Sequence, residues 1–411
     1  MSEGNAIPLE LRLRPDALRT LKHAGVAGNH AWLLSGDDPS GLSAAARWIA
    51  TRVLCAAGGG DDCSVCRRVA RGVHPDLHVV EPEGSALAIH QIHELVEQLV
   101  RRPFEAAAQV AIIVGADSLD ATNAPAGNAL LKILEEPPGP VVFVLLAQRA
   151  ARVLPTLRSR VVEVAFPPLS AAALTAALEG DGGDLPAVQT SGWDLQQLVR
   201  ISRGEYSRAV EVVTGGAAAV RRGVVLPAVA GLCGATIEPA DAAGVLLHRC
   251  EAVAQAQEAA ATAEFEQLIE GMPEKDGKRF RKSTEADGMG PRIKRRVRGA
   301  TNLELRCMLD EMAVWYRDLL AVRAGVPDVV VNADYLQTLQ GLAATPAAER
   351  AVAALDTVEE YQLRVLSNAD MTVALTAMCA ELASLAEGRI RSRRTIGALS
   401  RTTQNYELAV H

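Results

Sequence analysis

The sequence predicts an α/β protein: a parallel five-stranded sheet flanked by helices, then a small helical lid and an all-α C-terminal region. Three observations lead to this prediction. Short apolar runs alternate with helical segments over roughly the first 165 residues, a glycine-spaced loop follows the first of these runs, and helical periodicity prevails after residue 217.

Five apolar runs have the length and composition of strands that are buried on both faces of a sheet. They are Ala31–Ser35, Leu77–Val80, Val110–Val114, Val141–Ala147 and Val161–Ala165. Segments with helical spacing lie before and between them, at Leu9–Ala24, Ala44–Leu54, Ile89–Arg101 and Ala124–Glu136. Strands that alternate with helices at this interval favour a parallel sheet, in which ligands bind beyond the carboxyl ends of the strands.

The composition is that of an ordinary globular protein, with 49% hydrophobic and 22% charged residues among 411. This length favours two or three domains. The formal net charge of -7 gives no global attraction for nucleic acid, so a contact with DNA would have to be local. Because no apolar stretch approaches 18 residues and no basic-then-apolar segment begins the chain, the sequence predicts a cytoplasmic protein.

The stretch Gly36–Ser43 follows the first predicted strand and has the length and glycine spacing of a phosphate-binding loop. In a working loop, a lysine reaches the outer phosphates and a hydroxyl holds Mg²⁺. Gly36, Gly41 and Ser43 fit the pattern, but Leu42 stands in place of the lysine, and the adjacent Asp37-Asp38 pair would repel a triphosphate. The sequence therefore predicts a degenerate loop whose architecture is kept.

Three of the seven cysteines, Cys55, Cys63 and Cys66, lie close together in the sequence. Seven cysteines in so long a chain are no disulfide framework, and a Cys-x-x-Cys pair with a third thiol is typical of a metal site. Zinc prefers four tetrahedral ligands, and Asp61, Asp62 or His74 are candidates for the fourth. No spacing rule decides among them, and a reduced cluster without metal is the alternative.

Gly127–Pro138, which reads Gly-Asn-Ala-Leu-Leu-Lys-Ile-Leu-Glu-Glu-Pro-Pro, closely resembles a helix of bacterial clamp-loader subunits, which are AAA+ proteins. Thr156–Arg160 resembles the Ser-Arg-Cys motif of that family, with Val161 in the cysteine's place, and Gly204–Ala209 resembles its second sensor motif. The resemblance extends from His30 to Ala209, about half of the chain. It implies that the α/β region is an AAA+ module.

The resemblance also implies that this chain does not hydrolyse ATP. The family's Asp-Glu-Ala-Asp pattern corresponds to Val114–Asp117, where Asp117 alone keeps a carboxylate, and its polar first sensor corresponds to Leu146–Gln148. Hydrolysis needs carboxylates that hold Mg²⁺ and polarise the attacking water. Losing these together with the loop lysine is difficult to reconcile with turnover.

Two arginines and the cysteine cluster receive roles from the same resemblance. Arg160 matches the family's arginine finger, which crosses a subunit interface and stabilises the charge on a neighbour's γ-phosphate. An ordinary surface salt bridge is the alternative. Arg208 matches the second sensor arginine and is expected to hold the lid against the first domain. Four cysteines bind zinc in the family; here the fourth aligns with Val69, so zinc would be structural and held by Cys55, Cys63, Cys66 and a substitute.

The expected domains are an AAA+ domain at 1–167 with its cysteine module at 55–74, and a lid at 168–216. A helical collar at 217–387 and a disordered tail at 388–411 follow. Within the collar, Lys275–Arg298 holds ten Lys or Arg residues against three acids, which predicts a mobile insertion over 272–300. A solvated loop and a contact with DNA phosphates are the two interpretations of this insertion.

The resemblance implies a subunit of the DNA polymerase III clamp loader that closes a ring and lends Arg160 to a neighbouring ATPase. The implied partners are the delta subunit and the gamma or tau ATPase subunits, with the sliding clamp and primer-template DNA reached through the complex. The alternatives are a divergent ATPase that slowly hydrolyses its own nucleotide and a DNA-binding accessory protein.

Overall fold

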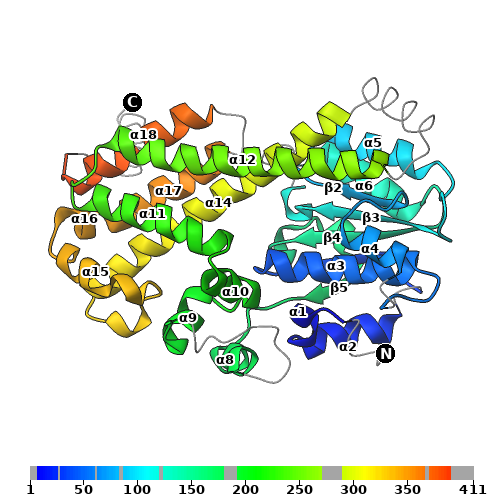
Figure 1. Ribbon diagram of the computed structural model, residues 1–411, viewed down its shortest axis with the longest axis horizontal. Coiled ribbons are helices and arrows are strands. Elements are labelled where there is room, and N and C mark those ends of the chain that lie inside the picture. The colour runs from blue at the N-terminus through cyan, green and yellow to red at the C-terminus, as the bar shows by residue number, and fades with distance from the viewer. Residues whose placement is uncertain are drawn as a thin grey trace, which may run out of the picture. The chain divides into compact units, whose positions relative to one another are not determined.

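The computed structural model describes residues 7–25, 28–60, 63–82, 87–119, 124–179, 192–270, 289–365 and 370–389. The chain divides into two compact units, Met1–Thr214 and Gly215–His411 (Figure 1). The first unit contains the residues of the expected AAA+ domain and those of the expected lid up to Thr214; residues 215–216 fall in the second unit. The boundary between the expected AAA+ domain and the expected lid, at residue 167, stays a prediction.

The first unit is built on a parallel five-stranded sheet, which confirms the predicted fold class. Its strands are β1 (Ala31–Ser35), β2 (Leu77–Val80), β3 (Gln109–Val114), β4 (Val141–Ala147) and β5 (Val162–Ala165). Their order in the sheet is β2-β3-β4-β1-β5, and every neighbouring pair is parallel. The first strand therefore lies inside the sheet, and the loop that follows it emerges between the ends of β4 and β5.

Alternate residues of the inner strands β1, β3 and β4 pack into two separate cores. Trp32 and Leu34 of β1 pack with side chains of α1 (Leu9–Arg12), α2 (Pro15–Ala24), α3 (Pro39–Leu54) and α4 (Ser64–Ala70). Leu33, on the opposite face, packs with α5 (Ile89–Leu99) and α6 (Ala124–Glu135). This alternation explains why the inner strands β1, β3 and β4 are almost entirely apolar, since both their faces are covered, whereas the edge strands β2 and β5 contain His78 and Glu163.

Two helices begin or end differently from the predictions. The segment expected as one helix at Leu9–Ala24 is divided between α1 and α2, because Arg14 has a non-helical backbone (φ -122°, ψ 74°) and Pro15 begins the next helix. Helix α3 begins at Pro39, five residues before the predicted start at Ala44. Asp38 caps it and Pro39 occupies its first turn, two features that favour a helix start.

Three helices of the first unit, α8 (Ala171–Glu179), α9 (Leu195–Ser202) and α10 (Tyr206–Thr214), lie in the segment predicted to be the lid. Gly204 lies between α9 and α10 with φ +82°, and its carbonyl accepts a bond from the Leu169 N–H at 2.9 Å. A side chain there would meet Pro168 and Leu169. The turn thus requires glycine and ties α9 and α10 to the segment before α8.

All the regular secondary structure described in the second unit is helical. Its elements are α11 (Ala217–Cys233), α12 (Pro239–Glu270), α14 (Met289–Arg323), α15 (Leu336–Leu342), α16 (Pro346–Glu349), α17 (Ala351–Val365) and α18 (Met371–Ala386), with short 3₁₀ turns at Pro327–Val329 and Ala333–Tyr335. They enclose one apolar core that includes Trp315, Met378 and Leu382. A buried ion cluster accompanies this core, in which Glu304 accepts from Arg221 and Arg249, each at 2.8 Å.

The predicted insertion at 272–300 is wrong in its C-terminal part. Met289–Arg298 belongs to α14, because this basic stretch continues into the helix that carries Trp315. Residues 271–288, which hold the rest of the Lys275–Arg298 segment, lie outside the described residues, as does the predicted tail from residue 390. Within the described part of the chain no single helix is long and apolar enough to cross a membrane, although α10 and α11 taken together would pass on length and composition alone.

Candidate functional site

The segment predicted to be a degenerate phosphate-binding loop, Gly36–Ser43, contains a shorter loop than its sequence pattern predicts. Gly36, Asp37 and Asp38 alone separate β1 from α3, so Gly41, Leu42 and Ser43 lie in the helix. The Asp38 carboxylate accepts a bond from the Gly41 N–H at 2.8 Å. An amide of the kind that binds phosphate in a working loop is therefore bonded to this chain's own carboxylate.

Arg14 neutralises Asp38. Its Nη2 lies 2.7 Å from Asp38 Oδ2, and the two side chains are 3% and 1% exposed. The same guanidinium donates to the carbonyls of Glu10 at 3.0 Å and Pro167 at 3.3 Å. The predicted repulsion of a triphosphate assumed that Asp38 carries a solvent-exposed negative charge. Instead, Asp38 forms a buried ion pair with Arg14 at the start of α3.

Gly36 and Leu42 are packed as structural residues. Gly36 donates to the Ala147 carbonyl at 3.1 Å, and a side chain at Gly36 would collide with the Phe166 carbonyl. Leu42 is 5% exposed and belongs to the core cluster that contains Trp32 and Phe166. The position of the family's lysine is therefore a core position in this chain.

Asp117, the remaining residue of the acidic pattern, joins the ends of two strands. It lies in the turn at Ala116–Ser118 after β3, and its Oδ2 accepts bonds from the Gln148 and Arg149 N–H groups, both at 3.1 Å. These two amides directly follow β4. The Asp117 carboxylate therefore holds together the ends of β3 and β4, where the first sensor of the family would lie. These two hydrogen bonds give Asp117 a structural role that requires no metal.

Arg160 follows the short helix α7 (Pro155–Arg158) and lies at the surface. It forms an ion pair with Glu135 at the end of α6, and its Nη1 donates to the Thr156 carbonyl at 2.9 Å. The Arg160 side chain is 40% exposed and that of Glu135 is 42% exposed. Exposed pairs of this kind stabilise a fold by at most about 1 kcal/mol, so Arg160 can exchange Glu135 for another anion at low cost.

The other two arginines singled out in the sequence are bonded within the first unit. Arg158 pairs with Glu163 at 2.8 Å, with both side chains partly exposed. Arg208 of α10 is buried, and its Nε donates to the Ile201 carbonyl of α9 at 2.8 Å. This bond joins two lid helices. The expected bond from Arg208 to the first domain stays a prediction.

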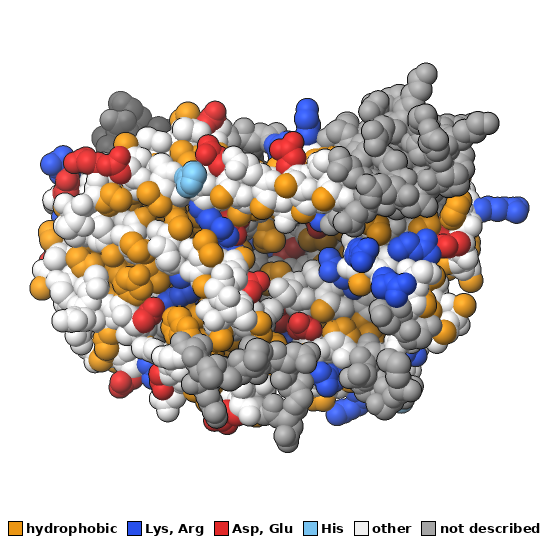
Figure 2. Space-filling model, in the orientation of Figure 1, with side chains coloured by type: hydrophobic (Ala, Val, Ile, Leu, Met, Phe, Trp, Pro, Cys, Tyr) orange, Lys and Arg blue, Asp and Glu red, His pale blue; other side chains and the backbone are white. Residues whose placement is uncertain are grey.

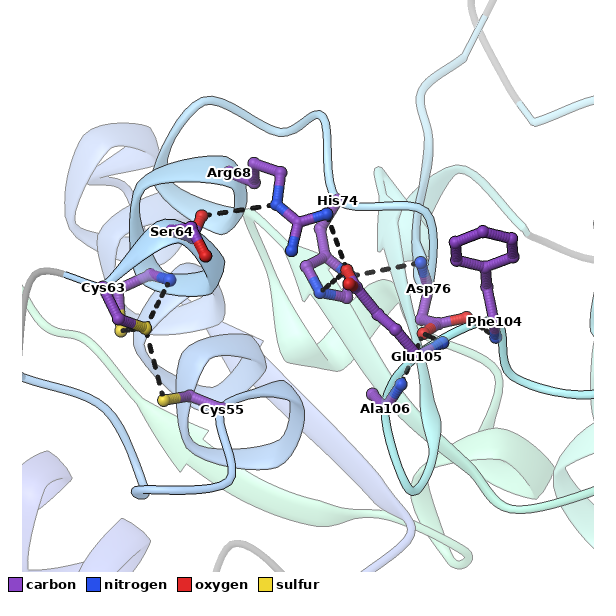
Figure 3. Close-up of polar contacts among 10 residues, drawn as sticks. Cys55, Cys63, Ser64, Arg68, His74, Asp76, Phe104, Glu105 and Ala106 are labelled. Atoms are coloured by element: carbon purple, nitrogen blue, oxygen red, sulfur yellow. Dashed lines mark hydrogen bonds and ion pairs between the residues drawn. The ribbon is translucent and has the colours of Figure 1, made fainter. Parts of the chain in front are cut away.

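The three clustered cysteines lie within metal-binding distance of one another (Figure 3). Cys55 ends α3, Cys63 caps α4, and their sulfurs are 3.8 Å apart, while the Cys63 and Cys66 sulfurs are 3.6 Å apart. Tetrahedral zinc with Zn–S bonds of about 2.3 Å would separate neighbouring sulfurs by roughly 3.8 Å. The three sulfurs therefore fit three corners of such a site.

The fourth corner is not filled by the expected residues that the structure describes. Val69 is fully buried in the apolar core, and His74 is bonded elsewhere: its Nε2 lies 2.9 Å from Glu105 Oε1, and its Nδ1 accepts from the Asp76 N–H at 3.1 Å. His74 is thus engaged in other contacts, and the identity of the fourth ligand stays a prediction. Asp61 and Asp62 lie outside the described residues.

A polar cluster that the sequence did not reveal connects α4 to the sheet (Figure 3). Glu105 pairs with Arg68 of α4 at 2.7 Å and with His74. Asp76, just before β2, accepts bonds from the N–H groups of Phe104, Glu105 and Ala106 at 2.5, 3.0 and 2.9 Å. Burial alone would raise the pKa of Asp76, but these amides outweigh burial and lower it.

The partners in this cluster are about 30 residues apart, so no local pattern could have paired them. Asp38 is different, because Asp-Pro before an apolar helical run is a recognised helix-start signal. The same residues also match the phosphate-loop pattern, which predicts a later helix start. The Asp-Pro signal alone predicts the observed start of α3 at Pro39.

Comparisons with known proteins agree with this architecture. A family model described as "DNA polymerase III, delta subunit" matches residues 16–170. The DNA polymerase III subunit delta' of Pseudomonas aeruginosa is 36% identical over 181 residues, which cover 43% of this chain and 53% of that protein. The subunit delta' of Bacillus subtilis is 36% identical over 149 residues, covering 36% of this chain and 44% of that protein.

A DNA polymerase III subunit gamma from Buchnera aphidicola is 33% identical over 137 residues, covering 32% of this chain and 37% of that protein. Among solved structures, a DNA polymerase III gamma subunit-related protein from Thermotoga maritima is 18% identical with a TM-score of 0.37, covering 90% of this chain and 100% of that chain. The match spans about half the length of the delta' relatives or less.

The parallel sheet, the glycine loop after β1 and the family match fall on the same residues. Residues 16–170 thus have the parallel α/β fold of an AAA+ module, and in sequence they are similar to clamp-loader subunits. Over this range the chain is similar to the DNA polymerase III delta prime subunits of Pseudomonas aeruginosa and Bacillus subtilis.

Proposed function

We propose that this protein is a non-hydrolysing subunit of a DNA polymerase III clamp loader, which scaffolds the ring while other subunits turn over ATP. The observation that carries the proposal is the buried Asp38 carboxylate, paired with Arg14 at the start of α3. A γ- or β-phosphate at this helix N-terminus would meet a negative charge instead of a lysine.

Displacing Asp38 to admit a nucleotide would be costly. It would leave Arg14 buried without its counter-ion, a loss of about 3–5 kcal/mol. No lysine at position 42 would offset that cost, since Leu42 packs in the core. The carboxylate pair that activates water is also missing at Val114 and Gly115.

The test is ATP turnover by the purified chain, compared with a protein-free blank and with Ser43→Ala. We expect no turnover above the blank in either sample. Turnover that Ser43→Ala abolishes would contradict the proposal and identify a divergent ATPase.

For Arg160 we propose the finger role in trans. Its partial exposure and its exchangeable partner Glu135 support this role. In a complex reconstituted with delta and gamma or tau subunits, Arg160→Ala should leave assembly intact and lower DNA-stimulated ATPase activity by about 10³-fold or more at the site it serves. Arg158→Ala, which removes an equally exposed neighbour, is the matched control. Unchanged ATPase activity in Arg160→Ala would refute the assignment.

We also propose that Cys55, Cys63 and Cys66 hold a structural zinc ion and that the helical second unit serves oligomerisation. Zinc would cross-link the end of α3 to the start of α4, and the sulfur spacings support this. Metal analysis of the purified chain and of Cys63→Ser tests the zinc site; equal metal content in both would exclude it.

The proposed partners of the oligomerising second unit and of the chain as a whole are the delta and gamma or tau subunits, and through them the sliding clamp and primed DNA.

A further inference from the structure

The three clustered cysteines of the first unit differ in their exposure to solvent. Cys55, which ends α3, is 5% exposed, whereas Cys63 and Cys66 are both partly exposed. Cys63 caps α4, and Cys66 lies in its first turn. A small oxidant in solution can therefore reach Cys63 and Cys66 more readily than Cys55.

Cys63 is the central thiol of the cluster (Figure 3). Its sulfur lies 3.6 Å from that of Cys66 and 3.8 Å from that of Cys55. The Cys66 N–H also donates to the Cys63 sulfur at 3.5 Å, which holds this sulfur against the turn that carries Cys66. Two sulfurs already in contact need to move by less than about 2 Å to reach the bond length of a disulfide. The two partly exposed thiols are thus also the pair with the shorter sulfur–sulfur contact.

The surroundings of this pair are those in which reactive cysteines are typically found, namely partly exposed and electropositive. Helix α4 contains two arginines, Arg67 and Arg68, and no acid. Figure 2 shows Lys and Arg side chains on the surface over α3 and α4.

Three cysteines of the second unit provide a contrast. Cys233, Cys250 and Cys379 are buried, and burial is the main cause that raises the pKa of their thiols to about 11, about 12 and about 12. Buried thiols of this kind stay protonated and are inert towards oxidants. An oxidant should therefore act on the cluster of the first unit before it acts on these three.

We propose that Cys63 and Cys66 form a peroxide-sensitive thiol pair, which mild oxidation joins in a disulfide while Cys55 remains a thiol. Hydrogen peroxide transfers one oxygen atom to the first thiol, which becomes a sulfenic acid, and its other oxygen leaves as water. The second thiol then attacks the sulfenic sulfur, so that the S–S bond forms and a second water leaves. The pair thus loses two electrons and two hydrogen atoms, and a dithiol reductant restores both thiols by exchange.

Oxidation would remove two of the three sulfur donors of the cluster at once. A metal ion held there would keep the Cys55 sulfur alone and would be released, since a stable zinc site needs several ligands. The inference goes beyond the zinc proposal and does not depend on it, because the contact between the two thiols is a property of the chain itself.

The test is mass spectrometry of one tryptic peptide, Val53–Arg67, which contains all three cysteines of the cluster. The full-length chain is treated with hydrogen peroxide, quenched, unfolded and alkylated. We expect most of the peptide to carry one alkyl group instead of three, with that group on Cys55, and to carry three again after dithiothreitol. A zinc indicator in the same sample follows metal release separately. A disulfide formed in a chain that holds no zinc would confirm this inference and refute the zinc proposal.

Single substitutions identify the reacting pair. Cys55→Ser should still form the disulfide, whereas Cys66→Ser should keep both of its remaining cluster thiols, because Cys55 is buried. Cys307→Ser is the matched control, since it removes another partly exposed cysteine, on α14, and it should behave as the unaltered chain does.

Three results would overturn the proposal: three alkyl groups on the peptide after peroxide treatment, a remaining thiol at Cys63 or Cys66 in place of Cys55, or no disulfide in Cys55→Ser. The first two are measured on the unaltered chain, so they decide the question even where a variant does not fold.

Discussion

Arg14 is the residue on which the start of α3 depends most directly. We predict that Arg14→Ala destabilises the first unit by about 3–5 kcal/mol, because it leaves the Asp38 carboxylate buried and unpaired. Denaturant unfolding measures the change. Arg19→Ala is the control, since Arg19 is 75% exposed in its pair with Asp16 and its loss should change stability by less than about 1 kcal/mol. Equal effects of the two substitutions would show that the buried pair contributes nothing.

His74 should make the stability of the first unit pH-dependent. Burial is the main cause that lowers its pKa below 6.5, and Arg68 adds to this, while Glu105 and Asp76 act in the opposite direction. As the pH falls below 6.5, His74 becomes protonated in the unfolded chain while it is still mostly neutral in the folded chain. The unfolding free energy therefore decreases from this pH downward.

The measurement is the melting temperature between pH 7.5 and 5, for the unaltered chain and for His74→Asn, which retains an acceptor near the position of Nδ1. We predict a smaller decline of melting temperature in the variant. His93→Asn, at an exposed position of α5, should leave the decline unchanged. An identical decline in all three proteins would assign the pH dependence to other groups.

At the residue scale, contacts between residues close in the sequence could be predicted, whereas contacts between residues far apart could not. The Cys63 and Cys66 pair is local, and the structure brings these two and Cys55 together as expected. The bonds of Asp76 to the amides of 104–106 are not local, and neither is the Arg14 to Asp38 pair, so both appear only once the chain has folded.

Helix α3 shows why a single substitution should not restore a nucleotide site. Leu42→Lys re-creates the lysine of the loop pattern, but position 42 is 5% exposed and faces the apolar core. We predict a stability loss of several kcal/mol and no ATP binding, since a buried unpaired ammonium is costly and the Asp38 carboxylate remains in place. Urea unfolding and calorimetric titration with ATP are the measurements.

Ser40→Lys is the control for that substitution, because it places a lysine at an exposed position in the first turn of the same helix. It should have little effect on stability. ATP binding by Leu42→Lys would show that the loop can still open around a phosphate, contrary to the packing of Asp38.

At the scale of elements, strands were easier to predict than helix ends. All five strands were expected within one residue of their observed bounds. The inner strands β1, β3 and β4 are buried on both faces and therefore form nearly continuous apolar runs, and the shorter edge strands β2 and β5 are also mostly apolar. Helix α14 was missed at its start, because a basic, glycine-containing stretch carries no apolar face until it reaches the residues that pack around Trp315.

The whole molecule consists of two units with separate cores, and each should respond to damage in its own core. Glu304 is 6% exposed and accepts from Arg221 and Arg249 in the second unit. We predict that Glu304→Gln destabilises this unit by about 3–5 kcal/mol, because two largely buried guanidinium groups lose their counter-ion. Calorimetry should show one transition at a lower temperature and the other unchanged.

Glu359→Gln, at an exposed position of α17, is the control and should leave both transitions in place. A single transition that shifts as a whole in Glu304→Gln would show that the two units unfold as one cooperative body. The division at residue 214 would then have no thermodynamic counterpart.

The Asp38 carboxylate has a further consequence for how such a subunit would behave in a working assembly. A nucleotide-binding loop alternates between filled and empty states, and that alternation drives movement. Here the anion at the start of α3 is part of the chain and cannot dissociate, so on our proposal the loop would keep a single state throughout. On our proposal, this subunit would serve as the fixed reference against which its neighbours move, and the timing of the cycle would be set entirely by them.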